Sequence, residues 1–149
     1  MVAVPSDLLL MDTSMPHGIV AYACNGAVVA EEHLIESRRH GEQLANVLGS
    51  VLAKAQKSFS DMNGIVIGTG PGSFVGVRVA MATGKGIAVA QQIPIWGVST
   101  LAALAFGAKE QSTGSVLALI DARRGQGYAC HYDGENAQLY TVEINGSEL

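Results

Sequence analysis

Charged residues are scarce in this chain, and acidic residues outnumber basic ones. Of the 149 residues, 15% are charged and 48% are hydrophobic, and the net charge is −4. This composition supports one well-filled globular core. It argues against the broad positive face that holds a nucleic-acid phosphate backbone. Any contact with RNA is therefore expected to come mainly through a partner.

Cysteine and long apolar runs are also lacking. Cys24 and Cys130 form no CxxC pair, so they fit small core residues of a reducing compartment, and no structural disulfide is expected. The start of the chain, MVAVPSDLLLMD, has no basic segment, and its apolar run is too short for a signal peptide or a membrane span. We expect a cytoplasmic protein that does not contact a membrane.

Several catalytic and ligand-binding patterns are missing. No two histidines lie three or four residues apart, where one helical turn would direct both at a metal ion, so we expect no metal site and no cofactor. The four histidines are His17, His33, His40 and His131. Neither GxxxxGK[ST] nor GxGxxG occurs. Ser73 and Ser99 lack a visible histidine and carboxylate arrangement that would make either one a nucleophile. No residue is therefore assigned a catalytic role.

The most informative segment that is present is a glycine loop. The sequence Gly68-Thr-Gly-Pro-Gly-Ser-Phe-Val-Gly-Val-Arg78 follows a strand-like run at 65–67 and leads into a helix-like segment. Gly70 and Gly72 allow positive φ and close backbone approach, and Ser73 can cap the helix. Such a loop either presents free N–H groups to an anion or forms a tight structural turn. Both interpretations stay open.

A second candidate site follows the first predicted strand. Asp12 suits a hydrated Mg²⁺ ion, and the hydroxyls of Thr13 and Ser14 suit a phosphate. The alternative is that these side chains only satisfy the turn after the strand.

Two further groups of charges each have a structural and a binding interpretation. Arg78 either ties down the glycine loop or contacts an anion or a partner. Asp121, Arg123 and Arg124 are either solvated turn charges or ligands of a carboxylate, a phosphate or a partner chain.

Hydrophobic periodicity predicts an alternation of strands and helices. The expected strands are Leu8–Met11, Ile19–Cys24, Ala27–Ala30, Ile65–Ile67, Ile93–Gly97, Val116–Ile120, Gly127–His131 and Gln138–Ile144. The expected helices run from Arg38 to about Lys57, from Val75 to Gln91 and from Thr100 to Phe106. Turns are expected at Asn25-Gly26 and Asp133-Gly134, His40 marks the first helix start, and Ser99 caps the third helix.

Both long helices carry stripes of small residues. Mid-helix glycines cost roughly 1 kcal/mol each relative to alanine, so close approach of a neighbour must compensate for them. Either the two helices pack on each other within the chain or they form a face for another chain. The stripes are Gly41, Ala45, Gly49 and Ala53 on the first helix, and Ala80, Gly84 and Ala88, with Ala82, Gly86 and Ala90 beside them, on the second.

Taken as one string, the glycine loop and the following VAMATGKGIAVAQQIPIWGVSTLAAL resemble the TsaB/YeaZ family. Three further motifs match in order, so the resemblance covers roughly residues 8 to 133. These motifs are Leu10-Met-Asp12-Thr13-Ser14, Ser37-Arg38-Arg39-His40 and Ile120-Asp121-Ala-Arg123-Arg124-Gly125. The family belongs to the "glycoprotease" superfamily, and its members are inactive homologues and partners of TsaD in bacterial tRNA threonylcarbamoyladenosine biosynthesis.

The resemblance implies an α/β protein with the actin-like ATPase (ribonuclease-H-like) fold. Residues 1–108 would form a complete first lobe, and residues 109–149 would form a partial second lobe of strands only, in a C-terminally short member. Strands without covering helices would leave an exposed sheet face that is prone to association.

The function implied is that of a non-catalytic partner subunit of TsaD, without peptidase activity. A homodimer is expected when the chain is alone, a TsaE-type ATPase is a further candidate partner, and tRNA is contacted only indirectly. The partner's helices would dock on Gly41, Ala45, Gly49, Ala53, Ala80, Gly84 and Ala88, beside the loop residues Gly70, Gly72 and Ser73. The alternative is an ATP-binding phosphotransferase or hydrolase fragment of the actin-like superfamily that uses Asp12 and the glycine loop.

Overall fold

The computed structural model describes residues 5–35 and 40–143. Residues 37–39 of the motif that resembles the family, and the expected strand end at residue 144, lie outside the described part. In chain order the elements are β1 (Asp7–Asp12), β2 (Gly18–Cys24), β3 (Ala27–Leu34), α1 (His40–Ala55), the 3-10 helix η2 (Phe59–Asp61), β4 (Gly64–Gly68), α2 (Phe74–Gln91), β5 (Ile95–Val98), α3 (Thr100–Lys109), β6 (Val116–Arg123), β7 (Gln126–Tyr132) and β8 (Ala137–Glu143). Every expected strand and helix is present, and the described part of α1 runs from His40.

The chain falls into two compact units. The first comprises Met1–Thr69 and Ser73–Gly97, and the second comprises Gly70–Gly72 and Val98–Leu149. The predicted lobe boundary lies after residue 108, whereas the division into compact units lies after Gly97. Helix α3 packs on β6 and β7, so it belongs to the second unit. No helix of the described part is long and apolar enough to cross a membrane.

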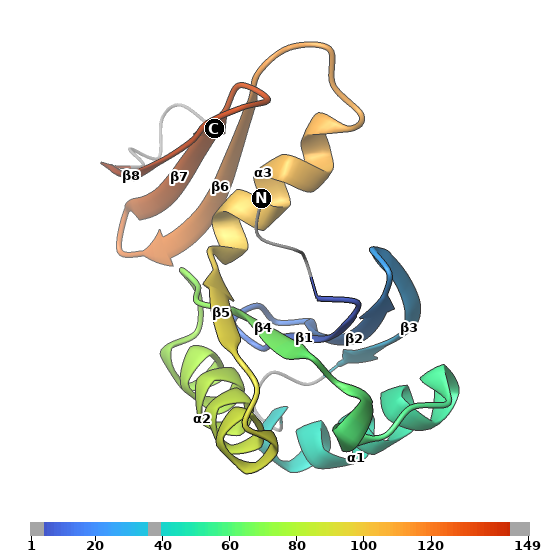
Figure 1. Ribbon diagram of the computed structural model, residues 1–149. Helices are drawn as coiled ribbons and strands as arrows, with labels where there is room; N and C mark the ends of the chain where they lie inside the picture. The colour runs from blue at the N-terminus through green and yellow to red at the C-terminus, as the bar shows by residue number, and fades with distance from the viewer. Residues whose placement is uncertain (1–4, 36–39, 144–149) are drawn as a thin grey trace. The chain divides into compact units, whose positions relative to one another are not determined.

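The first unit is a five-stranded sheet in the order β3-β2-β1-β4-β5. The central strand β1 pairs antiparallel with β2 and parallel with β4. The expected two-residue turn joins β2 and β3, since Asn25 and Gly26 have φ of 51° and 82°. Helices α1 and α2 cover the same face of this sheet (Figure 1). The core lies between this face, which carries Leu9 and Met11, and the two helices.

Helix α1 reaches the sheet through long apolar side chains. Leu44, Leu48 and Val51 are buried at helical spacing and pack in the core. Two ion pairs add contacts near its C-terminal end: Lys54 Nζ lies 2.7 Å from Glu32 Oε1, and Lys57 Nζ lies 2.8 Å from Asp7 Oδ1.

Helix α2 reaches the sheet through small residues instead. Ala80 is 0% exposed and Ala88 is 6% exposed. A Cβ added at Gly84, between them, would lie 2.9 Å from Ile67 Cγ2 and 3.2 Å from Ile95 Cδ1. This stripe therefore faces the chain's own sheet. The finding corrects the expectation that Ala80, Gly84 and Ala88 face a partner, and equally the expectation that they pack on the first helix.

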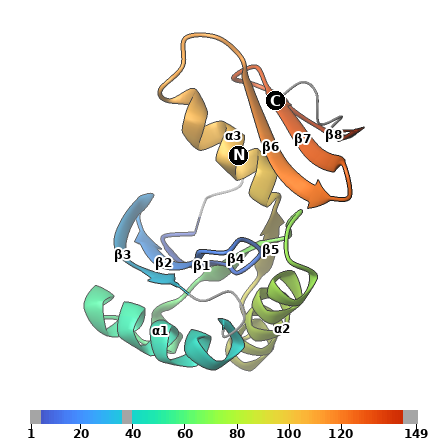
Figure 2. The same ribbon diagram turned by 180° about the vertical axis from the view of Figure 1, so that it is seen from behind.

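In the second unit, α3 crosses one face of the sheet β6-β7-β8 (Figures 1 and 2). Leu101 and Ala105 of α3 and Cys130 of β7 form its small core. The expectation of strands without a helix is therefore wrong for this face. The other face carries exposed side chains, as expected for strands without a covering helix. These are the side chains of Leu117, Leu119 and Tyr140 on β6 and β8.

Candidate functional site

Three elements of the first unit converge where β1 and β4 end. The Asp12 carboxylate lies directly over Gly68, so closely that an added Cβ there would overlap it. Its Oδ1 accepts a hydrogen bond of 2.8 Å from the Ser14 backbone N–H. The structure thus brings Asp12 together with the start of the glycine loop, and this bond is the one expected of a turn-forming aspartate.

The two hydroxyl residues after Asp12 hold the start of α2. Thr13 is 0% exposed, and its Oγ1 donates a 2.6 Å hydrogen bond to the Gly76 carbonyl. The Ser14 carbonyl accepts a 2.7 Å hydrogen bond from the Ser73 backbone N–H. Gly76 is required here, because an added Cβ would overlap the Thr13 carbonyl oxygen. These contacts bury Thr13 and Ser14 under α2.

The Gly70 and Ser73 backbone N–H groups of the glycine loop are bonded within the chain. The Gly70 N–H donates to Thr100 Oγ1 over 3.1 Å, and Ser73 Oγ caps α2 by accepting from the Gly76 N–H over 3.2 Å. Gly70 has a φ of +83°, so glycine is needed at this turn. The cap predicted at Ser73 is confirmed. Since these N–H groups have partners, the geometry favours the tight-turn interpretation over an anion cradle.

The arginines lie at the surface. The Arg78 guanidinium lies 5.1 Å from the centre of the Phe74 ring and makes a cation–π contact with this first residue of α2. In the β6–β7 turn, Asp121 Oδ1 accepts a 2.7 Å hydrogen bond from the Arg123 N–H. Arg123 and Arg124 are exposed and have positive φ. Asp121 thus shapes the turn, and the two arginines stay available to solvent or a ligand.

The small-residue stripe of α1 faces outward. Gly41, Ala45, Gly49 and Ala53 are all exposed. A Cβ added at Gly41 would lie 3.9 Å from Val79 Cγ2 of α2, and one added at Gly49 would meet no neighbouring atom within 4 Å. This set, called the α1 stripe below, leaves room for another backbone to approach.

Helix α2 also has an outward face, which is distinct from its buried stripe. Val75 and Val89 are 68% and 79% exposed, and Ala82, Gly86 and Ala90 are exposed as well. At Gly86 an added Cβ would meet no neighbouring atom within 4 Å. The second small-residue line of α2, and not the first, therefore lies at the surface.

Metal-ligating residues and thiols form no site in the described part. No group of three or more histidine, cysteine, aspartate or glutamate side chains within residues 5–35 and 40–143 could hold a metal ion. Both cysteines are free; Cys130 is buried, which raises the pKa of its thiol, whereas Cys24 is half-buried.

Several important residues were not singled out from the sequence. Gly76 is one, although a glycine in the first turn of a helix is a usable signal of close approach. Thr100, the partner of Gly70, is another, and nothing local in the sequence marks it. Val75 and Val89 are a third case, because the apolar composition of the helix does not mark them as exposed.

The fold defines the class of the protein. A sheet in which three antiparallel strands are followed by helix, strand, helix and strand, and which leads to a second sheet, is the ribonuclease-H-like arrangement of the actin-like ATPase fold. A model of the TsaD family, described as tRNA N6-adenosine threonylcarbamoyltransferase, matches residues 28–144.

Individual relatives narrow the family. The tRNA threonylcarbamoyladenosine biosynthesis protein TsaB of Escherichia coli (strain K12) is 36% identical over 137 residues, 91% of this chain and 59% of that protein. TsaB of Bacillus subtilis (strain 168) is 32% identical over 135 residues, 91% of this chain and 58% of that protein. The structure of YeaZ from Pseudomonas aeruginosa superposes with a TM-score of 0.83 at 32% identity, covering 97% of this chain and 70% of that one.

The chain belongs to the TsaB/YeaZ family. It spans about three-fifths of the length of the curated TsaB relatives named above.

Proposed function

We propose that this chain is a cytoplasmic, non-catalytic partner subunit of a TsaD-type enzyme in tRNA threonylcarbamoyladenosine biosynthesis. The pathway is suggested by the names of its TsaB relatives. The partner is suggested by the match of residues 28–144 to the TsaD family itself. Homologous chains offer similar faces, so they can pair about a pseudo-two-fold axis as subunits of homodimers do.

The observation that carries the proposal is the α1 stripe. Gly49 sits in mid-helix at a cost of roughly 1 kcal/mol relative to alanine, yet within residues 5–35 and 40–143 no neighbouring atom lies within 4 Å of a Cβ added there. A helix of the partner that approaches closely would use this space. The outward face of α2, with Val75 and Val89, supplies exposed apolar area. The proposed interface therefore consists of the α1 stripe and the outward face of α2. The buried stripe of α2 is no longer part of it.

A non-catalytic role is also consistent with the strand-end cluster. The Thr13 hydroxyl already donates a hydrogen bond to the Gly76 carbonyl and lies fully buried. A nucleotide phosphate would have to displace the start of α2 to reach it. The net charge of −4 supports contact with tRNA through the partner. A TsaE-type ATPase is a further candidate partner of the assembled pair.

Without the enzyme, we propose that the same outward faces pair two copies of this chain. Light scattering during gel filtration over a concentration series tests this. A mass of twice 15.5 kDa that falls on dilution is expected, whereas a constant monomer mass would contradict the dimer.

The main test mixes this chain with the TsaD protein of its own organism and measures the mass of the complex by light scattering. A one-to-one complex is expected. The longer E. coli TsaB, mixed with the TsaD protein of its own organism, is the control that has to form a complex under the same conditions. Two separate peaks at micromolar concentration, with the control intact, would contradict the proposed partner role for this chain.

A further inference from the structure

The segment Gly70–Gly72 lies between β4 and α2 in sequence, but it belongs to the second unit. Its two neighbours, Thr69 and Ser73, belong to the first unit, and the chain changes units again between Gly97 and Val98. The chain thus passes between the units at the three peptide bonds 69/70, 72/73 and 97/98.

Hydrogen bonds attach Gly70 to the start of α3. Its N–H donates to Thr100 Oγ1 over 3.1 Å, and its carbonyl accepts from the Thr100 N–H over 2.9 Å. The carbonyl also accepts from Ser99 Oγ over 3.3 Å. Gly70 and Thr100 are both buried, so water does not readily replace these bonds.

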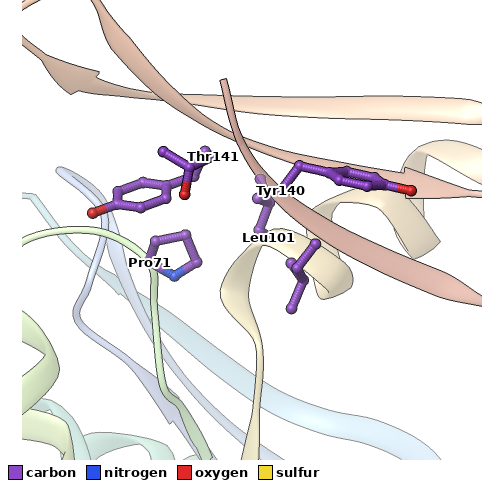
Figure 3. Close-up of a pocket in the computed structure, with 6 residues that line it drawn as sticks. Pro71, Leu101, Tyr140 and Thr141 are labelled. Atoms are coloured by element: carbon purple, nitrogen blue, oxygen red, sulfur yellow. The ribbon is translucent and has the colours of Figure 1, made fainter. Parts of the chain in front are cut away.

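The next residue, Pro71, lies beside side chains of the same unit. Pro71 lines a pocket of about 300 Å³ together with side chains of α3, β7 and β8. Figure 3 shows Pro71 and Leu101 lying beneath the strand that carries Tyr140 and Thr141. Pro71, which is half-buried, therefore borders the same space as residues of α3, β7 and β8.

Ser73, the residue after this segment, is attached to the first unit. The Ser73 N–H donates to the Ser14 carbonyl over 2.7 Å, and Ser73 Oγ caps α2. One peptide bond, between Gly72 and Ser73, therefore separates a segment held by α3 from the cap of α2.

We propose that Gly70–Gly72 is a latch that moves with the second unit, and that the three crossings form the hinge between the units. Thr100 closes the latch. A displacement of the second unit is then transmitted to Ser73 and hence to the start of α2. The proposal does not depend on the proposed function.

Residual dipolar couplings of the whole ¹³C,¹⁵N-labelled chain test the proposal directly. Each unit is fitted with its own alignment tensor, the loop residues being left out of both fits. The N–H vectors of Gly70 and Gly72 and the Cα–H vectors of 70–72 are expected to fit the tensor of the second unit. A fit to the tensor of the first unit would overturn the latch, and one tensor shared by both units would overturn the hinge.

The variant Thr100→Val removes the hydroxyl oxygen while keeping the shape of the side chain. The couplings of Gly70 and Gly72 should then cease to fit the second tensor, and the Gly70 amide should exchange with solvent about tenfold faster. Thr100→Ser keeps the hydroxyl and should behave as the original chain does. Thr113→Val, at an exposed position of the same unit, is the matched control. Unchanged couplings and exchange in Thr100→Val would overturn the role of Thr100; if that variant fails to fold, the couplings of the unaltered chain still decide the proposal.

Discussion

Helices α1 and α2 carry the same sequence pattern but use it in opposite directions. On α2, Ala80, Gly84 and Ala88 are buried against the chain's own sheet. On α1, the stripe with Gly49 is exposed, and a Cβ added at Gly49 would meet no neighbouring atom of the described residues within 4 Å. A small residue at every fourth position therefore does not show by itself whether the stripe packs on the chain's own sheet or lies at the surface.

The difference follows from what else each helix offers the sheet. Helix α1 has Leu44, Leu48 and Val51 on its inner face, and their side chains fill the space above the strands. Its small residues are thereby left on another side. Helix α2 has no such row of leucines, and a Cβ added at Gly84 would contact Ile67 of β4 and Ile95 of β5. Substitutions at the glycines should therefore have opposite effects on the two helices.

The largest effect is expected for Gly76→Ala on α2. The added methyl would overlap the backbone carbonyl oxygen of Thr13, which cannot move without distorting the end of β1. The free energy of unfolding should fall by about 3 kcal/mol, the upper range for overpacking. Urea unfolding measures it, with Gly86→Ala as the control on the same helix. An unchanged midpoint for Gly76→Ala would mean that the close seating of α2 on Thr13 is wrong.

A smaller effect sharpens the comparison between the two stripes. Gly84→Ala places a methyl 2.9 Å from Ile67 Cγ2, so unfolding should become easier by about 1–2 kcal/mol. Gly49→Ala meets no neighbour, and the gain in helix propensity should stabilise the chain by up to about 1 kcal/mol. Shifts of the same sign in the two urea curves would contradict the opposite orientations of the stripes.

The smallest effect concerns pH and the attachment of α1. The pKa of Asp7 is lowered from its ordinary value of 3.8, chiefly by the hydrogen bond from Lys57 and then by that from Ser6. A lowered carboxylate pKa in the folded state adds stability that is present above the unfolded value and is lost as the pH falls through the folded value. Asp7→Asn should therefore make unfolding less sensitive to acid, in melts recorded between about pH 2 and pH 6. Parallel curves for the two proteins would show that the Asp7–Lys57 pair does not contribute.

Local chemistry made much of the fold predictable. The caps at Ser73 and Ser99 and the turn at Asn25-Gly26 are each confirmed. These features depend on residues close in sequence, which side-chain capping and turn propensities describe well.

Long-range contacts explain the wrong predictions. Helix α2 is apolar on nearly every side, so periodicity did not show which stripe meets the sheet. The boundary between the units was placed at the polar segment after α3, but Leu101 and Ala105 of α3 bury themselves against Cys130. The bond between Gly70 and Thr100 joins residues 30 positions apart, which no local pattern records.

The central claim is that the α1 stripe is a surface for the TsaD-type partner, whereas the matching stripe of α2 is core. Isothermal titration of the TsaD protein of the same organism with the Gly49→Leu variant tests it most directly, with Gly107→Leu on α3 as the matched control at another open position. Gly49→Leu should keep the melting temperature of the original chain but weaken binding by about 5- to 150-fold, the equivalent of overpacking by about 1–3 kcal/mol. Gly107→Leu should bind as the original chain does. Equal affinities for all three proteins would contradict the claim.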